Sequence, residues 1–232
     1  MKVEILFRPS SSVANVLLET GESIQVESGA MVAMSPTLEM ETQATGGLLK
    51  SFSRSAFGGE SFFFNTFTAK KNDERIVLSP PLPGDLTVIE MQGRSILVHS
   101  GSYMASSSGI EIDTKWSGAK GFFAGEGFVM LQVSGTGTLI LSSYGAIQSL
   151  WLKGGEKMIV DTGHLVAFDQ QMSYQVKKVA GWKSTLFSGE GLVVEIAGPG
   201  QLYLQGRSQD SFLAWLLSSL PDMFYKLFDR DG

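Results

Sequence analysis

The chain has 232 residues, of which 43% are hydrophobic and 18% are charged, and its formal net charge is −5. This length and composition predict a globular protein with a substantial core, and the acidic balance disfavours a nucleic-acid-binding surface, which would carry a basic stripe. The chain contains no cysteine, which excludes disulfides, thiolate catalysis and zinc–thiolate sites.

The N-terminal segment MKVEILFRPSS does not fit a signal peptide, because Glu4 and Arg8 interrupt the apolar stretch that such a peptide needs. No run of about 18 apolar residues occurs in the sequence. We therefore expect a cytoplasmic protein that does not span a membrane. The 27 glycines, set among segments rich in Val, Ile, Leu and Phe, favour short strands joined by tight turns, so the predicted fold class is all-β.

Internal similarity is the main sign of organisation, because one pattern occurs three times along the chain. The segments GESIQVESGAMVAM, GRSILVHSGSYMAS and GEKMIVDTGHLVAF align without a gap. In each, polar and apolar residues alternate as in a half-buried strand, and a Ser-Gly or Thr-Gly pair then predicts a turn or bulge. The glycines of these three pairs are Gly29, Gly101 and Gly163.

Each copy then reaches a Phe-x-Gly-Glu unit, and a further predicted strand follows it. The residues of these units are Phe57 and Glu60, Phe123 and Glu126, and Phe187 and Glu190. We interpret the three glutamates as one structural solution used three times, in which each carboxylate bonds backbone N–H groups or pairs across an interface. Catalytic carboxylates need environments that differ, and equivalent positions do not provide them.

The repeats also define the predicted domains. We expect a first β repeat with the N-terminal strand over residues 1–85, a second over 86–147, a third over 148–207 and a helical tail over 208–232. Each repeat is predicted to be a small β-sandwich of four or five strands, which is too small to bury its own hydrophobic face. Packing the three tandem repeats against each other would supply a shared core.

One segment of the first copy, GGLLKSFSRSAFGG, differs from its counterparts in the other copies. Its apolar residues Leu48, Leu49 and Phe52 alternate loosely with basic residues. Two interpretations stay open. The segment is either an ordered loop whose aromatic side chains fill the core, or a contact patch for a neighbouring subunit, a ligand or a membrane surface.

The segment GGLLKSFSRSAFGGESFFFNTFTA, the LSPPLPGD at 78–85 and the threefold Gly-Glu unit resemble bacterial relatives of the altered-inheritance-of-mitochondria family, whose biochemical function is unknown. The resemblance covers about residues 2–207. It implies a fold like that of the tryptophan RNA-binding attenuation protein, tripled within one chain, and three chains closing into a ring of nine units. Mitochondrial members are associated with inner-membrane organisation, which implies a structural role more than an enzymatic one.

The residues offer no catalytic or metal-binding set. The two histidines, His99 and His164, occupy non-equivalent positions in their repeats, and we interpret both as surface or turn residues and not as metal ligands. The short glycine patterns at 135–137 and 198–200 lack the Lys-Ser/Thr of a phosphate loop and predict hairpin turns. We therefore expect a protein that is not an enzyme and holds no cofactor.

The last segment, QDSFLAWLLSSLPDMFYKLFDRDG, lies outside the repeats. Asp210 or Ser211 is the expected cap of a helix, and Pro221 ends or restarts it. The segment is too short to span a bilayer, so it is expected either to dock on protein or to lie at a membrane interface. Its candidate contact residues are Phe212, Trp215, Leu216, Phe224 and Phe228.

Three hypotheses for function follow. The preferred one is a non-enzymatic scaffold or interaction protein that forms a homotrimeric ring and could associate with a membrane surface. The first alternative is a small-ligand-binding module that uses clefts between repeats. The second is a metal enzyme with a cupin-like barrel. Nucleic acid is not an expected partner. The attenuation protein binds RNA, but the resemblance to it is one of fold, and a shared fold does not carry function.

Overall fold

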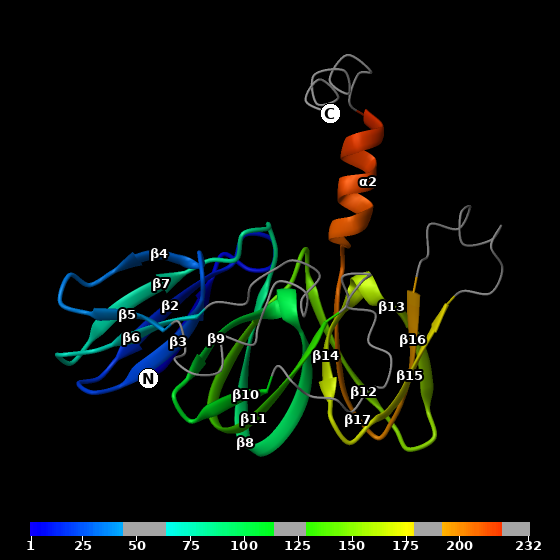
Figure 1. The fold of residues 1–232 in the computed structure, drawn as a ribbon, viewed down its shortest axis with the longest axis horizontal. Helices are drawn as coiled ribbons and strands as arrows, with labels where there is room; N and C mark the ends of the chain where they lie inside the picture. The colour runs from blue at the N-terminus through cyan, green and yellow to red at the C-terminus, as the bar shows by residue number, and fades with distance from the viewer. Residues whose placement is uncertain (44–63, 114–128, 179–191, 220–232) are drawn as a thin grey trace.

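The computed structural model describes residues 1–43, 64–113, 129–178 and 192–219 (Figure 1). Within these ranges the regular elements are strands, apart from two single-turn 3-10 helices and one α-helix near the C-terminus. The chain is therefore all-β with a short helical tail, and the coarse fold class predicted from the sequence is confirmed.

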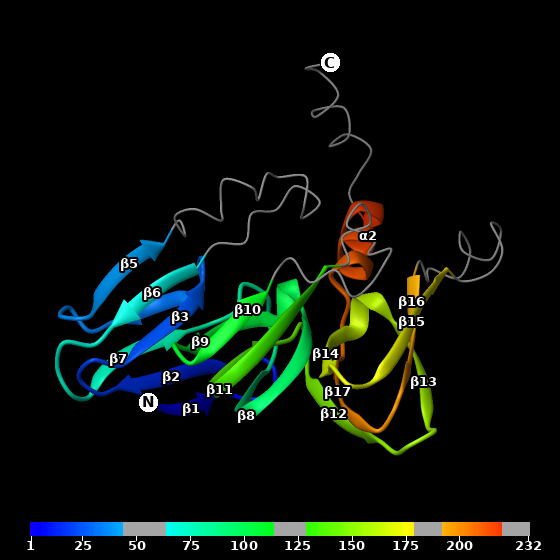
Figure 2. The same ribbon diagram turned by 60° about the horizontal axis from the view of Figure 1, so that its bottom comes forward.

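The strands lie in chain order along an elongated body, with the N-terminal part at one end and the C-terminal part at the other (Figures 1 and 2). The N-terminal part contains β1 (Lys2–Leu6), β2 (Val13–Leu18), β3 (Ser23–Glu27), β4 (Met31–Met34), β5 (Glu39–Gln43), β6 (Phe64–Thr68) and β7 (Glu74–Leu78). The middle part contains β8 (Leu86–His99), η2 (Ser100–Ser102), β9 (Tyr103–Ser107), β10 (Ile110–Asp113) and β11 (Met130–Ser142). The C-terminal part contains β12 (Ile147–Leu152), β13 (Lys157–Asp161), η4 (Thr162–His164), β14 (Leu165–Asp169), β15 (Ser173–Lys178), β16 (Leu192–Ala197), β17 (Gly200–Gln205) and α2 (Gln209–Ser219).

The described strands form three antiparallel sheets. A four-stranded sheet has the order β1-β2-β7-β4, and a three-stranded sheet has the order β13-β16-β15. The third sheet runs through all three parts in the order β12-β17-β14-β8-β11-β9-β3-β6-β5, with β10 paired to β11. The parts are thus joined by continuous strand pairing and not only by side-chain packing.

The core follows from the alternation that the sequence displays. Buried and partly exposed residues alternate along β2, β3 and β16, so one face of each strand points inward. The buried side chains form three clusters, one centred on each part of the chain. The clusters include large side chains that are almost fully buried, such as Phe67, Tyr103 and Phe168. Burying such aromatic side chains is a main stabilising contribution in a protein of this size.

The middle part differs from the prediction of separate short strands. Each of β8 and β11 is one long strand, and the two pair with each other from Leu86 to His99, with a register shift between Ser134 and Thr136. Gly93 lies inside β8 with φ of 80°, in the left-handed region that favours glycine. Gly93 turns the chain locally without ending the pairing, so β8 continues through it. Residues 135–137 lie inside β11, so the hairpin turn predicted there is wrong.

Candidate functional site

Most of the candidate residues named from the sequence lie outside the described part of the chain. These are the residues of the three Phe-x-Gly-Glu units, Phe57, Glu60, Phe123, Glu126, Phe187 and Glu190, the loop residues Leu48, Leu49 and Phe52, and the tail residues Phe224 and Phe228. The site is therefore built from the remaining candidates, Gly29, Gly101, Gly163, Phe212, Trp215 and Leu216.

The three repeated glycines follow a strand in each part, but their conformations differ. Gly29 lies in a turn with φ of 91°. Gly101 and Gly163 instead lie in the 3-10 turns η2 and η4. In η4 the backbone N–H of Gly163 donates to Asp161 Oδ1 at 2.7 Å, which holds the turn beside the start of α2.

The 3-10 turn η4 supports the base of α2. Gly163 lies so close to Ser208 that a Cβ added to the glycine would be 2.6 Å from Ser208 Oγ. Gln205, at the end of β17, donates through Nε2 to the carbonyl oxygen of Gly163 at 2.8 Å. His164 contributes a bond of 2.8 Å between its Nδ1 and the carbonyl oxygen of Gln205. These contacts fix where the chain leaves the β body.

Ser208, and not Asp210 or Ser211, caps α2. The backbone N–H of Ser211 reaches Ser208 Oγ at 3.4 Å, and the N–H of Phe212 donates to the Ser208 carbonyl at 3.1 Å. This is the geometry of an N-cap, in which a side-chain oxygen accepts from a first-turn N–H group. The cap expected from the sequence was therefore two or three residues too late. Ser and Asp cap helices about equally well, so residue type alone does not select among neighbouring candidates.

Aromatic contacts then set the direction of α2. The ring of Phe212 packs edge-on against Tyr144, with ring centroids 6.0 Å apart, and stacks on Trp215 at 6.0 Å. Arg207 lies just before α2, and its guanidinium carbon is 5.9 Å from the centroid of the Tyr144 ring. These contacts involve only the first turns of α2, and beyond them the helix stands away from the β body (Figures 1 and 2).

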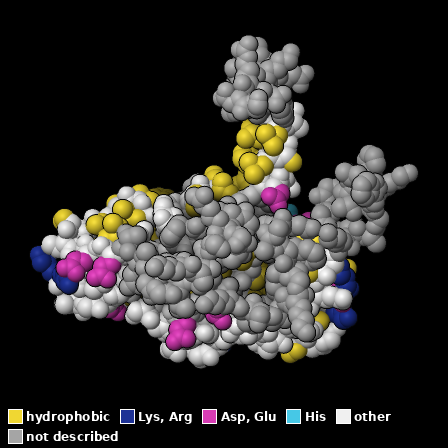
Figure 3. Space-filling view, viewed as in Figure 1, with side chains coloured by type: hydrophobic (Ala, Val, Ile, Leu, Met, Phe, Trp, Pro, Cys, Tyr) yellow, Lys and Arg dark blue, Asp and Glu magenta, His cyan; other side chains and the backbone are white. Residues whose placement is uncertain are grey.

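The rest of α2 is exposed although its side chains are apolar (Figure 3). The exposed fraction is 62% for Trp215, 51% for Leu213 and 51% for Leu217. Phe212 and Leu216 retain 37% and 38% exposure. Exposed apolar side chains are common when scattered singly, but five on one short helix form a contiguous exposed apolar patch.

A small cavity of about 140 Å³ lies beside the base of α2. Both 3-10 turns line it, through Gly101 and Gly163, so it lies between the middle and C-terminal parts. Its wall also contains the buried hydroxyl-bearing residues Ser102 and Ser142, together with Asp210 from the first turn of α2. These walls offer hydroxyl and carboxylate groups as hydrogen-bonding partners for a small polar molecule.

His99 also lines this cavity; it is half-buried and lies directly before the 3-10 turn η2, in keeping with the surface or turn position expected from the sequence. Burial lowers the pKa of His99 from 6.5 to about 4, although the nearby Asp210 carboxylate acts in the opposite direction. The imidazole is therefore neutral at neutral pH and can both donate and accept a hydrogen bond.

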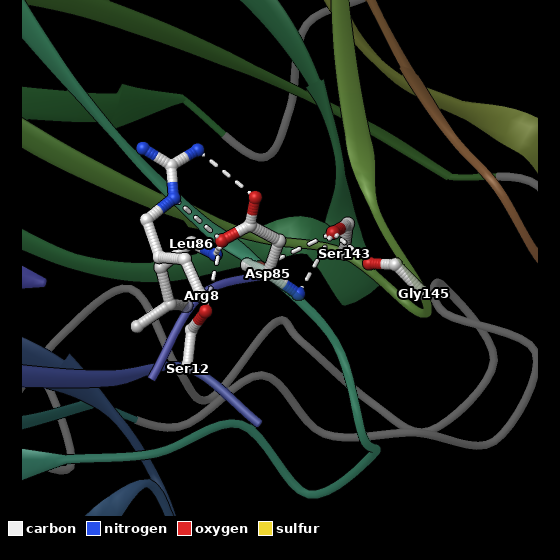
Figure 4. Close-up of polar contacts among 6 residues, drawn as sticks. All are labelled: Arg8, Ser12, Asp85, Leu86, Ser143 and Gly145. Carbon is white, nitrogen blue, oxygen red and sulfur yellow. Dashed lines mark hydrogen bonds and ion pairs between the residues drawn. The ribbon is translucent and has the colours of Figure 1, made fainter. Parts of the chain in front are cut away.

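A second polar cluster surrounds Asp85, at the end of the LSPPLPGD segment (Figure 4). The carboxylate accepts hydrogen bonds from Nε and Nη2 of Arg8, both at 2.9 Å, so the ion pair is bidentate. It also accepts the hydroxyl of Ser12 and the backbone N–H of Leu86, both at 2.8 Å. Burial acts to raise the pKa of Asp85, but these hydrogen bonds together lower it below its ordinary value.

The same segment contacts the turn after β11. The Ser143 hydroxyl bonds the Gly145 carbonyl at 2.8 Å, and Gly84 pairs with Gly145 in an isolated parallel bridge. A Cβ on Gly84 would lie 1.7 Å from the Ser143 carbonyl oxygen, so no residue with a side chain fits at this position unless the backbone moves. The Asp85 cluster thus joins the N-terminal loop, the segment before β8 and the turn after β11. Its groups bond each other, so we interpret it as structural.

The described ranges contain neither a metal-binding cluster nor a membrane-spanning helix. In these ranges, no group of three or more His, Asp or Glu side chains is placed to hold a metal ion. The helix found in the part of the chain that the structure describes is too short to cross a bilayer.

The fold and site define an all-β protein with an exposed apolar helix and a small polar cavity. The chain belongs to the family described as mitochondrial biogenesis AIM24, whose model matches residues 3–207, and the family resemblance seen in the sequence is confirmed. An uncharacterised protein of Streptococcus pyogenes serotype M6 is 28% identical over 213 residues, which cover 88% of this chain and 85% of that protein. A crystal structure of a Streptococcus pyogenes protein from a structural genomics programme is similar with a TM-score of 0.77 and 25% identity, covering 94% of this chain and 99% of that one.

Proposed function

We propose that the protein is a non-enzymatic scaffold made of three similar β units, and that its copies associate head to tail into a closed ring. The observation that carries the proposal is a strand pairing that joins neighbouring parts twice within the chain. Among the described strands, the corresponding edges of β13 and β4 have no partner strand. The units correspond to the N-terminal, middle and C-terminal parts of the body.

Equivalent strand pairings support the three-unit organisation. β4 pairs with β7, β9 with β11 and β14 with β17, each time with the strand that ends its part of the chain. Each of these pairings has a register shift at the same place of the aligned sequence, after Met31, Tyr103 and Leu165. A bulge at the same position in three unrelated stretches of chain would be a coincidence, whereas repeated units require it.

A repeated hydrogen bond supports the same organisation. The backbone N–H groups of Arg75, Thr138 and Gln201 occupy one position of the aligned repeats. They donate to Ser35 Oγ at 2.9 Å, to Ser107 Oγ at 3.0 Å and to Asp169 Oδ2 at 2.8 Å, respectively. The acceptors also share one aligned position, although Asp replaces Ser in the last case.

The junctions between parts use a second pairing. β3 of the N-terminal part pairs with β9 of the middle part, and β8 pairs in the same way with β14. By the same rule β13 would pair with the next unit, but its described partner is β16 alone. Likewise, among the described strands, β4 pairs with β7 alone and has no strand on its other edge. Open edges of this kind are sites for pairing with another chain.

The register of this intermolecular pair follows from the two junctions inside the chain. Leu97 lies opposite Phe168, and both are buried, with 0% and 1% exposure. The corresponding residues at the open edges are Ile159 on β13 and Met34 on β4, which are 66% and 37% exposed. Pairing β13 of one copy with β4 of the next would bring Ile159 opposite Met34 and bury both, as at the internal junction.

Because the two edges differ, the contact is heterologous, and copies related by rotation form a ring when the rotation closes. A ring of three chains is the assembly that the family resemblance implies. Sedimentation equilibrium tests it, and the expected mass is three times the 25.1 kDa of one chain. Ile159→Lys and Met34→Glu should each shift the protein towards monomer. The double variant should recover part of the assembly, because it places opposite charges face to face.

Trp151→Lys is the matched control, since Trp151 is 61% exposed on β12, a strand that the proposed contact does not use. It should leave the mass unchanged. A 25.1 kDa monomer at micromolar concentration of the unaltered chain would contradict the ring. So would an assembly that neither edge substitution disturbs.

The cavity at the base of α2 favours a second candidate function, the binding of a small polar ligand between units. Its walls carry the neutral His99 and the hydroxyls of Ser102 and Ser142. A ligand bound by the native state raises the unfolding temperature with concentration. A thermal-shift screen with polyols and amides tests this candidate, with Ser102→Val as the variant that should lose the response. Equal shifts in both proteins would argue against it.

A further inference from the structure

We infer that α2 inserts into the interfacial region of a lipid bilayer by burying its apolar side chains, and that this binding does not depend on attraction to anionic lipid. The inference rests on the proposed ring only for the number of helices that bind together. The occupant of the exposed helix is thus a lipid surface and not a protein groove.

The distribution of apolar residues around α2 favours lipid. At 100° per residue, the side chains from Trp215 through Phe212, Leu216 and Leu213 to Leu217 cover an arc of about 200°. A helix that packs against a protein core needs a stripe of about 100°. A single groove would therefore leave apolar side chains in water, whereas lipid can surround the whole arc.

The charges of α2 point to the way in which it binds. No Asp, Glu, Lys or Arg occurs between Ser211 and Ser219, and the acidic Asp210 lies in the first turn beside the body. The whole chain carries a net charge of −5. Without basic residues to attract anionic lipid, burial of apolar area is the favourable contribution to membrane binding. This contribution is as large on neutral lipid as on anionic lipid.

The base of α2 presents the helix to a surface. Contacts of Phe212 with Tyr144, and of Ser208 with Gly163, hold the first turn against the body. The 11 residues of α2 extend about 16 Å from that base, which reaches past the headgroups of one leaflet. The side chains from Ser211 to Ser218 are all exposed, and Phe212 contacts the body through the ring of Tyr144 at the base.

A ring adds valency to this contact. Subunits related by one rotation axis all hold α2 at the same angle to that axis, so a ring in which α2 points along the axis presents every copy to one bilayer. One short helix binds weakly, but several linked contacts multiply, because each further insertion is intramolecular. The assembly would therefore bind a vesicle far more tightly than a monomer does.

Vesicle co-sedimentation with the full chain tests the inference, with sedimentation equilibrium run on each variant. The protein should bind vesicles of phosphatidylcholine alone, and phosphatidylserine should not increase binding at low salt. Trp215→Ser should lower the partition coefficient about tenfold or more, because a bilayer would bury a side chain of this size. Trp151→Ser is the matched control, since Trp151 and Trp215 are 61% and 62% exposed, and it should change nothing.

The outcomes separate this inference from the ring. If Ile159→Lys gives a monomer that binds vesicles more than tenfold more weakly than the unaltered chain, both stand. If the unaltered chain is monomeric but binds neutral vesicles through Trp215, the inference stands and the ring fails. A ring that does not bind phosphatidylcholine vesicles overturns the inference. Dissociation of the ring by Trp215→Ser also overturns it, because α2 would then be covered by another copy.

Discussion

Gly163 supports Ser208 at a distance that leaves no room for a side chain, since a Cβ on the glycine would lie 2.6 Å from Ser208 Oγ. Gly101 occupies the equivalent position of the other 3-10 turn, and there the nearest atoms to an added Cβ, those of His99, are 3.6 Å away. The two glycines look equivalent in the sequence, but only Gly163 is required by a close approach.

Gly163→Ala should therefore displace Ser208 and weaken the cap of α2, at a cost of about 1–2 kcal/mol. Gly101→Ala is the matched control, because its Cβ would make an ordinary van der Waals contact. Hydrogen exchange of the amides of residues 209–219 should be faster in the first variant than in the second. Equal protection in both would mean that the turn does not hold the helix.

Asp85→Ala should destabilise the protein by about 2–4 kcal/mol at pH 7, because it leaves the Ser12 hydroxyl and the Leu86 N–H without an acceptor. The pKa of Asp85 is lower in the folded protein than its ordinary 3.8. The stability it contributes is thus present above pH 3.8 and is lost as pH falls through the folded pKa. Denaturant unfolding between pH 7 and pH 2 measures both effects.

Glu4→Ala is the control for this experiment, because Glu4 is exposed on β1. It should change stability by less than about 0.5 kcal/mol at any pH. An acid unfolding profile that is the same in Asp85→Ala and the unaltered chain would show that folding does not lower the pKa of this carboxylate.

His99 should make the protein less stable as pH falls from 6.5 to about 4. Burial lowers the pKa of His99 from 6.5 to about 4, so the unfolded chain takes up this proton first. The free energy of unfolding is unaffected by this group above pH 6.5, and it falls by about 3 kcal/mol by pH 4 because the unfolded chain binds the proton more tightly. His99→Gln should flatten the stability profile in this window. The chain has 2 histidines, so NMR titration can follow His99 directly, and a midpoint near 6.5 would contradict the prediction.

The repeated hydrogen bond gives a test of the three units. Ser107→Ala and Ser35→Ala should each cost about 1 kcal/mol, because each removes one acceptor from a backbone N–H. Asp169→Ala should cost more, because this carboxylate is 4% exposed and also lies 3.7 Å from Arg94. Thermal unfolding compares the three variants. Very different costs for the two serines would mean that the units do not share this bond.

The alternation of apolar residues is enough to place several elements along the chain. The segments SIQV and KMIV correspond to β3 and β13, and the apolar stretch after Asp210 corresponds to α2. These predictions succeed because a strand buries every second residue and a helix follows its own period, so the signal lies within a few neighbouring residues. The same signal could not reveal that β8 and β11 are each continuous, since glycine is compatible with a turn as well as with a strand.

The sequence by itself therefore determined the all-β class, the threefold pattern and the apolar tail, since each depends on residues close together in the chain. Only the tertiary structure decided that Arg8 meets Asp85 across 77 positions, that Ser208 caps α2 over Gly163, and that β13 and β4 keep open edges among the described strands. The physical reason is that such contacts depend on the order of strands in the sheets. Hydrogen bonding between strands fixes that order, and local residue patterns do not encode it.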